Sequence, residues 1–258
     1  MHTYKRIEIG SASDPFDSAA QIVAEDGTDN YIVAFPQTDE INSAVYAYGN
    51  LSIGKTASAG QTTGSITISN YDNASQDLYC VYATGTATVN GGKLNLEAAS
   101  PSGTNSSYGL YGETAVDVTK GIVNVTAGTE AGLNHSVYGI YSKGTISIGT
   151  EGATSNNEVS LNITANPAQI NSVGIYLESD TGKAVTINSG IVNIKANGFL
   201  VGAGNNIANC VYSGGAINLV GGNITLNATG QDDNNCALHA AGNGKIINMD
   251  VSSFEIEN

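Results

Sequence analysis

Apolar residues alternate with polar or small residues in short runs along this chain, and the runs recur in a fixed order from Ser43 onwards. A representative repeat contains Tyr138-Gly139-Ile140-Tyr141, then Ile146-Ser147-Ile148, then Leu161-Asn162-Ile163-Thr164-Ala165. Period-two alternation of this kind is typical of strands that are buried on one face, and none of the repeats has helical spacing. The sequence therefore predicts three short β-strands in every repeat.

The repeats align in seven copies whose columns keep their chemistry. An aliphatic residue stands directly before the tyrosine position of each copy: Val45, Val81, Leu110, Ile140, Ile175, Val211 and Leu238. The second and third strands of each copy each add two apolar positions. Because a fixed-order repeat of this length builds a stacked architecture, we expect an all-β protein, a right-handed parallel β-helix (solenoid) of about seven three-strand rungs.

Glycines and insertions indicate where the chain turns. Gly64, Gly92, Gly121, Gly190 and Gly222 fall two residues before the third strand of their repeats. A tight bend at that corner requires the conformational freedom of glycine. Segments that lengthen single repeats, at 54–63, 149–158 and 178–182, are expected to bulge from the rod.

The first 42 residues do not fit the repeat. Asp14-Pro15-Phe16-Asp17 has the pattern of a helix start, with Asp14 as N-cap and Pro15 at the first helical position. We therefore expect residues 1–42 to form an N-terminal cap, a short helix plus a strand at Tyr31–Phe35, and residues 43–258 to form the β-helix. At the other end no cap is visible, which predicts a fragment of something longer or an end that docks on a partner.

Charge and composition narrow the classes of partner. Acidic residues outnumber basic ones 23 to 9, which gives a net charge of −14, and Arg6 is the only arginine. Nucleic acids and anionic lipids require clustered cations that this sequence lacks. Neither a signal peptide nor an apolar run long enough for membrane insertion is present. A surface rich in Ser, Thr, Asn and Gly favours an extracellular or cell-surface location.

The three cysteines are not expected to pair. Cys80 and Cys210 share one column but lie four rungs apart, roughly 19 Å at the strand spacing and beyond the reach of a disulfide. Cys236 falls one column earlier than Cys210, so their side chains should point to opposite faces. We expect three isolated small residues and no metal or other cofactor.

Catalytic chemistry is poorly represented on the predicted outer faces. Hydrolysis of a glycoside requires two carboxyl groups ~5–9.5 Å apart, whereas the outward row of the second strands holds a single acid, Asp117, and no base. Asp232-Asp233 is the only adjacent acidic pair and is expected in a solvated loop. The segment Glu25-Asp26-Gly27-Thr28-Asp29-Asn30 lacks the spacing of a calcium loop, which favours an ordinary acidic turn. We expect the protein not to be an enzyme.

Two polar or aromatic columns remain as candidates. Asn95, Asn124, Asn162 and Asn193 occupy consecutive rungs, where their amides can hydrogen-bond along the rod. The candidate site is the tyrosine column, which His239 continues: Tyr46, Tyr82, Tyr111, Tyr141, Tyr176 and Tyr212. Strict alternation points these rings outward, on the same face as the small residue two positions earlier. Stacking in the sheet is one interpretation of the column, and a platform for sugar rings is the other.

The phrases that carry this pattern also resemble a known group of proteins. Gly139-Ile140-Tyr141-Ser142-Lys143-Gly144-Thr145-Ile146-Ser147-Ile148 and Gly190-Ile191-Val192-Asn193-Ile194-Lys195-Ala196 resemble β-helix repeats of large bacterial cell-surface proteins. Many of those proteins are described as adhesin-like or carbohydrate-binding, and their fold is similar to that of pectate lyases. The resemblance covers about residues 43–258 and implies architecture more strongly than activity.

Three functions therefore stay open. The first is a non-catalytic surface β-helix, an adhesin or stalk that binds a neutral polysaccharide or another cell-surface partner on the tyrosine column. The second is a polysaccharide lyase or hydrolase of the pectate-lyase-like fold, which would need close carboxylates. The third is a structural subunit of a phage spike or fibre, which would associate as a trimer. The sequence does not fix the oligomeric state.

Overall fold

The computed structural model describes residues 7–9, 16–34, 41–56, 58–59, 63–71, 76–99, 105–131, 134–153, 158–178, 182–198, 207–230, 235–241 and 245–257. These residues form strands and no helix. The strands lie in two sheets, and neighbouring strands in each sheet run parallel. Successive strands of the chain alternate between the sheets, so the chain winds as a parallel β-helix. The expected fold class is therefore confirmed.

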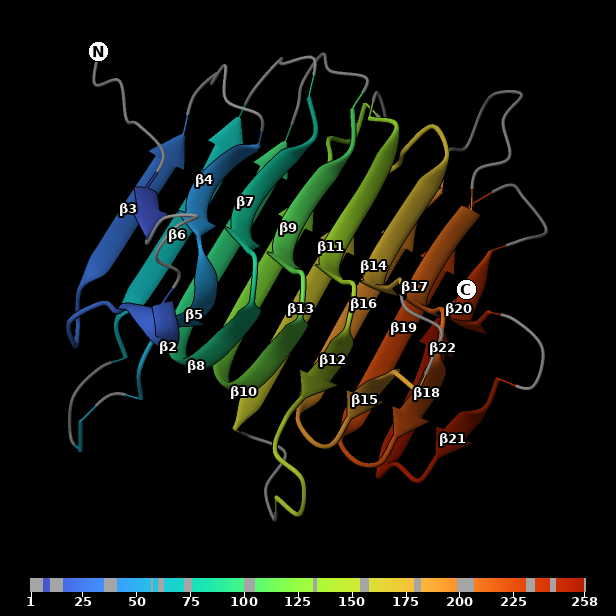
Figure 1. Ribbon diagram of the computed structural model, residues 1–258. Coiled ribbons are helices and arrows are strands. Elements are labelled where there is room, and N and C mark those ends of the chain that lie inside the picture. The colour runs from blue at the N-terminus through green and yellow to red at the C-terminus, as the bar shows by residue number, and fades with distance from the viewer. Residues whose placement is uncertain are drawn as a thin grey trace.

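The first sheet contains the first strand of every rung. Its eight strands follow one another along the rod from the blue end to the red end of Figure 1. They are β1 (Ile7–Ile9), β4 (Asn42–Ala47), β7 (Leu78–Ala83), β9 (Ser107–Gly112), β11 (Ser136–Ser142), β14 (Asn171–Leu177), β17 (Ile207–Ser213) and β20 (Cys236–Ala240).

The second sheet has 14 strands and contains the second and third strands of the rungs. In two rungs one long strand passes through the corner and serves as both: β8 (Thr86–Ala99) and β10 (Ala115–Ala127). The second strands of the other rungs are β2 (Phe16–Ile22), β5 (Gly49–Ile53), β12 (Thr145–Ile148), β15 (Ala184–Ile187), β18 (Ala216–Leu219) and β21 (Ile247–Met249). Their third strands are β3 (Asp29–Ala34), β6 (Ser65–Tyr71), β13 (Val159–Ala165), β16 (Ile191–Asn197), β19 (Asn223–Thr229) and β22 (Ser253–Glu257).

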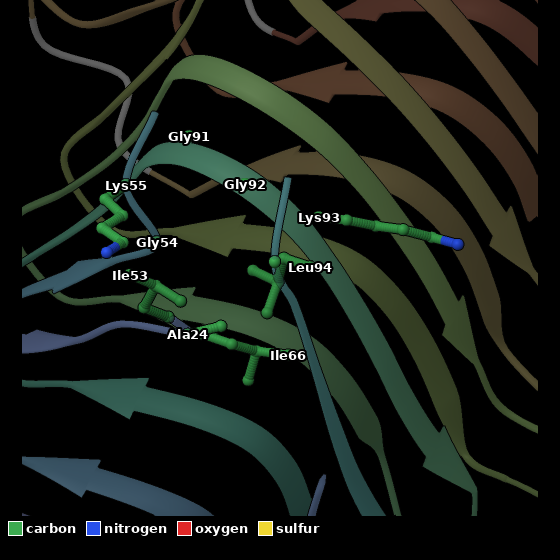
Figure 2. A pocket seen from close by; sticks show the side chains of 10 residues that line it. Ala24, Ile53, Gly54, Lys55, Ile66, Gly91, Gly92, Lys93 and Leu94 are labelled. Carbon is green, nitrogen blue, oxygen red and sulfur yellow. The ribbon is translucent and has the colours of Figure 1, made fainter. Parts of the chain in front are cut away.

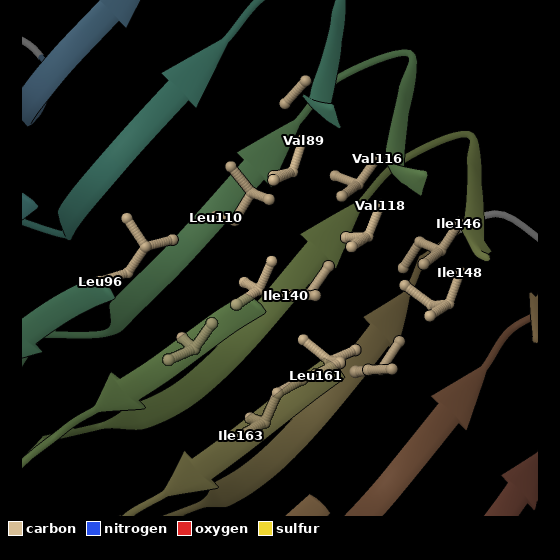
Figure 3. Close-up of a cluster of buried hydrophobic side chains, with 14 of the residues drawn as sticks. Val89, Leu96, Leu110, Val116, Val118, Ile140, Ile146, Ile148, Leu161 and Ile163 are labelled. Carbon is tan, nitrogen blue, oxygen red and sulfur yellow. The ribbon is translucent and has the colours of Figure 1, made fainter. Parts of the chain in front are cut away.

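Aliphatic side chains fill the space between the sheets along the whole rod. In the rung built from β11, β12 and β13, the side chains of Ile140, Ile146, Ile148, Leu161 and Ile163 are at most 2% exposed. Figure 3 shows these five residues pointing into one interior cluster. The rungs from β4 to β19 repeat the pattern, whereas Ile247, Met249 and Ile256 of the last rung are exposed. Burial of apolar surface, at about 25 cal/mol per Å², therefore stabilises these rungs as one continuous narrow core.

The N-terminal segment corrects one expectation. Where the sequence predicted a helix beginning near Asp14, Phe16–Ile22 is a strand, β2, which pairs in parallel with β5. β1 and β3 likewise pair with β4 and β6, so these three strands add one more rung in register. A local capping pattern stabilises a helix by only ~1 kcal/mol. Pairing with the otherwise open edges of β5 and β6 gives the segment a row of backbone hydrogen bonds, which outweighs that preference. The expected strand at Tyr31–Phe35 is confirmed as far as Ala34, where β3 ends, and Phe35 lies outside the described residues.

Glycine lies at the corner before the third strand for the predicted reason. Four of the five glycines have a positive φ: Gly92, Gly121, Gly190 and Gly222. A Cβ on Gly121 would lie 2.6 Å from the carbonyl oxygen of Gly92 in the rung below. Gly64 has no positive φ, and it is required instead by the carbonyl oxygen of Glu25, 2.3 Å from where a Cβ would lie. The insertions also fall between strands as expected, after Ile53, Ile148 and Leu177.

The predicted register of the cysteines is confirmed. Cys236 pairs with Asn209 and is therefore one position out of line with Cys210. All three cysteines are free thiols, and both Cys80 and Cys210 are buried. Burial raises the pKa of each of these two thiols to about 12, which makes them poor nucleophiles.

Candidate functional site

The tyrosine column forms a stack on the outer face of the first sheet. The centroids of consecutive rings are 5.2, 4.6, 5.0, 4.9 and 4.7 Å apart, and their planes differ by at most 17°. The rings that take part are Tyr46, Tyr82, Tyr111, Tyr141, Tyr176 and Tyr212. His239 ends the stack, with its ring 5.0 Å from that of Tyr212 and inclined by 61°. The predicted ladder is therefore present.

The ladder is less accessible than the sequence predicts. Tyr46, Tyr82 and Tyr111 are only 8%, 7% and 5% exposed, whereas Tyr141 and Tyr176 are partly exposed. Rings that repeat at the ~4.8 Å spacing of parallel strands cover one another's faces. Only ring edges and hydroxyl groups reach the surface along the stack. An open platform on which a sugar could lie flat against each ring is therefore not formed.

A second tyrosine column lies beside the first and was missed by sequence reasoning. Tyr79, Tyr108 and Tyr138 stack on one another with centroids 4.5 and 4.9 Å apart. Each of these rings meets rings of the first column edge-on, as Tyr79 meets Tyr82 at 5.0 Å and 89°. The signal in the sequence was the phrase Tyr-x-x-Tyr, which occurs in three consecutive repeats. Together the columns form a herringbone, an arrangement that suits the ring quadrupoles.

The two columns share a face because the strands do not alternate strictly. In β7 the side chains of Cys80 and Val81 are both fully buried, between the outward Tyr79 and Tyr82. The regular pairing with β9 includes Tyr79 and Val81 but skips Cys80. The expectation that the small residue lies under the tyrosine on the outer face is therefore wrong. The position is small because it faces inward, where a Cβ on Gly139 would lie 2.4 Å from Cγ2 of Ile163.

Charged side chains line the edge of this tyrosine face. The hydroxyl of Tyr82 donates to Oε1 of Glu113 at 2.7 Å, and the hydroxyl of Tyr141 donates to Oε2 of Glu178 at 3.0 Å. Between these acids, Lys143 donates to Oε1 of Glu113 at 3.0 Å. Burial, reinforced by the adjacent carboxylates, raises the pKa of Tyr82 and of Tyr141 well above the usual value. These hydroxyls therefore stay protonated and remain donors.

The two tyrosine hydroxyls at the C-terminal end of the ladder are not bonded to a described carboxylate, unlike those of Tyr82 and Tyr141. Tyr176 and Tyr212 form no hydrogen bond through their hydroxyls to any described residue, although their rings stack at 4.7 Å and 5°. Burial raises the pKa of Tyr176, and no carboxylate among the described residues accepts a hydrogen bond from its hydroxyl. Both rings are partly exposed. These two residues are the part of the predicted site that can donate to and accept from a ligand.

The asparagine column forms the predicted ladder on the second sheet. Nδ2 of each asparagine donates to Oδ1 of the one before it, at 2.9 Å from Asn124 to Asn95, 3.0 Å from Asn162 to Asn124 and 2.9 Å from Asn193 to Asn162. Asn95 ends the chain of bonds on Oγ1 of Thr67 at 3.1 Å. All donors point the same way along the rod, and the expected structural role is confirmed.

The described acidic residues do not gather into a metal-type or catalytic cluster around Asp117. Asp117 lies between Thr88 and Ser147 in the outward row of the second strands, and its burial raises its pKa. In the acidic turn that begins at Glu25, Oδ2 of Asp26 accepts from the backbone N–H of Ser58 at 3.1 Å. No group of three metal-ligating side chains occurs among the residues that the structure places. Asp232-Asp233 lies outside the described residues.

A small cavity near the N-terminal end carries no additional chemistry. Figure 2 shows the apolar side chains of Ile53, Ile66 and Leu94 beside Gly91 and Gly92. Lys55 and Lys93 extend from it in different directions in the same view. Lys55 forms an ion pair with Glu25 at 3.4 Å, on the surface. Among the residues that the structure describes, no helix is long and apolar enough to cross a membrane.

The chain was compared with protein-family models, with curated proteins and with solved structures, and no match was found in any of the three comparisons.

Proposed function

We propose that this chain is a rigid, non-catalytic module of a bacterial surface protein, an adhesin or stalk, that holds an extended neutral polysaccharide along its tyrosine face. The observation that carries the proposal is the partly exposed C-terminal end of the ladder, where the hydroxyls of Tyr176 and Tyr212 bond to no described residue and their rings stack on each other. Phenol groups of this kind combine apolar edges with a donor and an acceptor, which suits sugar hydroxyls.

The mode of contact differs from the flat stacking that an isolated aromatic residue offers. Because neighbouring rings cover one another's faces, a glycan would contact ring edges and phenol oxygens in succession. One such contact is weak, but contacts repeated along a polymer add through effective concentration. The proposal therefore includes negligible affinity for monosaccharides and measurable affinity for a long neutral polysaccharide. An anionic polymer fits less well, since Glu113 and Glu178 line the same face.

The lyase or hydrolase alternative has less support. Asp117 is the one acid among the described outward residues of the second strands, and its neighbours in the row are Thr88 and Ser147. Both schemes of glycoside hydrolysis need a second carboxyl group within ~10 Å, on the other side of the scissile bond. The phage-fibre alternative makes a different prediction, a trimer in solution, which sedimentation equilibrium would detect.

The test begins with a glycan-array screen of the full chain and continues with the strongest neutral polysaccharide. Each lost hydrogen bond costs ~1 kcal/mol, so the double variant Tyr176→Phe, Tyr212→Phe should weaken binding by about ten-fold or more. Tyr31→Phe, at an exposed tyrosine on β3 of the second sheet and away from the tyrosine face, is the matched control. The proposal fails if the wild type retains no neutral polysaccharide, or if the double variant binds as the control does.

A further inference from the structure

A second polar surface lies on the other sheet, away from the tyrosine face. A shallow depression crosses the outer face of β13, β16, β19 and β22. Hydrogen-bonding side chains line it: Asn162, Thr164, Asn193, Lys195, Asn227 and Glu257. The tyrosine columns belong to the first sheet, so the two surfaces are built from different strands.

The register of the strands arranges these side chains in two rows. In one row Lys195 lies between Thr164 and Asn227, each directly paired with it in the neighbouring strand. In the adjacent row Asn193 lies between Asn162 and Thr225 in the same way. Positions in a row are ~4.8 Å apart, the spacing of neighbouring strands. The surface is thus a small grid of donors and acceptors on a rigid backbone.

Several polar groups in this grid are unused. Lys195 has no hydrogen bond or ion pair with any residue in the described part of the chain. Asn193 donates one amide proton to Asn162, and its second amide proton and carbonyl oxygen bond to no described residue. Oδ1 of Asn227 is buried and has no partner, while its Nδ2 donates to Glu257 over a long 3.4 Å. A buried acceptor without a donor is costly, and a bound hydroxyl would relieve that cost.

We propose that this depression is a binding site for one or two units of a neutral, polyhydroxylated ligand, the class to which uncharged sugars belong. A sugar hydroxyl both donates and accepts, so neighbouring hydroxyls can accept from Lys195 and donate to Oδ1 of Asn227. The bond from Asn227 to Glu257 gives way as the ligand enters, which frees the amide to turn. The site does not depend on the function proposed for the tyrosine face.

Charge selects against anionic ligands at this site. Glu257 borders the depression, and Glu255 pairs with Thr225 in the adjacent row, so β22 adds two carboxylates to the two rows, two strands from Lys195. The net charge of −14 acts in the same direction. The asparagine ladder accounts for the bonds of Asn162 and Asn193, but it leaves Lys195 and Asn227 unexplained. These two residues distinguish a binding site from a purely structural ladder.

The test is an NMR titration of the full, ¹⁵N-labelled chain that follows asparagine side-chain amides. The probes are three neutral trisaccharides, cellotriose, maltotriose and mannotriose, and one anionic trisaccharide, trigalacturonate. At least one neutral probe is expected to shift the side-chain signals of Asn193 and Asn227, and Lys195→Ala is expected to lower its affinity about ten-fold, since a charged hydrogen bond is lost. Lys93→Ala, an exposed lysine on β8 of the same sheet, is the matched control.

Each other outcome overturns the inference. These outcomes are no shift with any neutral probe, stronger binding of trigalacturonate, or equal affinity in Lys195→Ala and Lys93→Ala. The variant Tyr176→Phe, Tyr212→Phe should leave the shifts of Asn193 and Asn227 unchanged. If that variant loses polysaccharide binding while Lys195→Ala retains the trisaccharide affinity, the tyrosine-face proposal stands and this one falls. If Lys195→Ala loses the trisaccharide affinity while Tyr176→Phe, Tyr212→Phe retains polysaccharide binding, the depression is the binding site and the tyrosine-face proposal falls.

Discussion

The hydroxyl of Tyr82 donates a hydrogen bond to Oε1 of Glu113, 2.7 Å away on the next rung of the rod. The same oxygen accepts from Nζ of Lys143 at 3.0 Å, one rung further on. Three consecutive rungs are therefore tied together at the edge of the tyrosine face by one carboxylate. Against the effect of partial burial, these two bonds hold the pKa of Glu113 below its usual value.

Removing the Tyr82 hydroxyl should reduce stability in a pH-dependent way. We expect Tyr82→Phe to lower the free energy of unfolding by about 1–2 kcal/mol near neutral pH, because the carboxylate loses a donor. A depressed folded-state pKa gives a contribution that is present above the usual carboxyl value of 4.5 and lost as pH falls through the lower folded value. Urea unfolding at several pH values measures this. Tyr176→Phe, whose hydroxyl is unpaired, should change stability little at any of them.

Alkaline pH should unfold the tyrosine face cooperatively. Burial raises the pKa of Tyr82, Tyr108 and Tyr141 above the ordinary phenol value of 10.0. A raised folded-state pKa contributes stability that is complete below pH 10 and declines as pH rises above it. Phenolate absorbance and far-UV circular dichroism, recorded together, should therefore change in one joint transition. Ionisation of all tyrosines near pH 10 with unchanged dichroism would contradict the burial of these rings.

The asparagine ladder should be most sensitive in its middle. Asn124 bonds to Asn95 and to Asn162, so Asn124→Ala removes two hydrogen bonds and should cost about 2 kcal/mol. Asn193 bonds only to Asn162 among the ladder residues and is exposed, so Asn193→Ala should cost about 1 kcal/mol or less. Thermal and urea unfolding of the two variants provide the comparison. Equal losses would show that the amide bonds add little.

The corner glycines can be tested with one substitution and a matched control. Gly121 has a φ of 102°, and its added Cβ would lie 2.6 Å from the carbonyl oxygen of Gly92. We expect Gly121→Ala to cost at least about 2 kcal/mol from backbone strain and steric conflict. Gly152 has a φ of 71° but nothing within 4 Å of its Cβ position, so Gly152→Ala should cost only about 1 kcal/mol. If both variants unfold alike, the close approach at the corner is not what selects glycine.

Thiol reactivity should separate the three cysteines. Cys80 and Cys210 are buried, and burial raises the pKa of each thiol to about 12. Cys236 is partly exposed. In the native state at pH 8 a thiol reagent should label Cys236 alone within minutes, and all three cysteines after denaturation. Rapid native labelling of Cys80 or Cys210 would place them outside the core.

Period-two alternation in a fixed-order repeat was sufficient to predict the solenoid, its interior columns and the asparagine ladder. The columns that contain Ile146 and Asn162 recur at the same position of successive rungs. The direction of each side chain therefore follows from whether its position along the strand is odd or even. That Asp117 is the one acid in the described outward row of the second strands could be read from the same parity. These features are local or repeat with the sequence, and no long-range information is needed to place them.

The tertiary structure decided what parity could not. The strand β2 replaced a predicted helix because its hydrogen-bond partners in β5 lie more than 25 residues away, beyond the reach of a capping pattern. The break in alternation at Cys80 brought Tyr79 beside Tyr82 and turned a single ladder into a herringbone. Whether an outward ring is accessible depends on the rings stacked above and below it, and whether Lys195 is paired depends on strands on either side. Such neighbours are set by the winding of the chain. The sequence alone determined which faces the rod has. The packing of neighbouring rungs decided which side-chain groups on those faces remain available to a ligand.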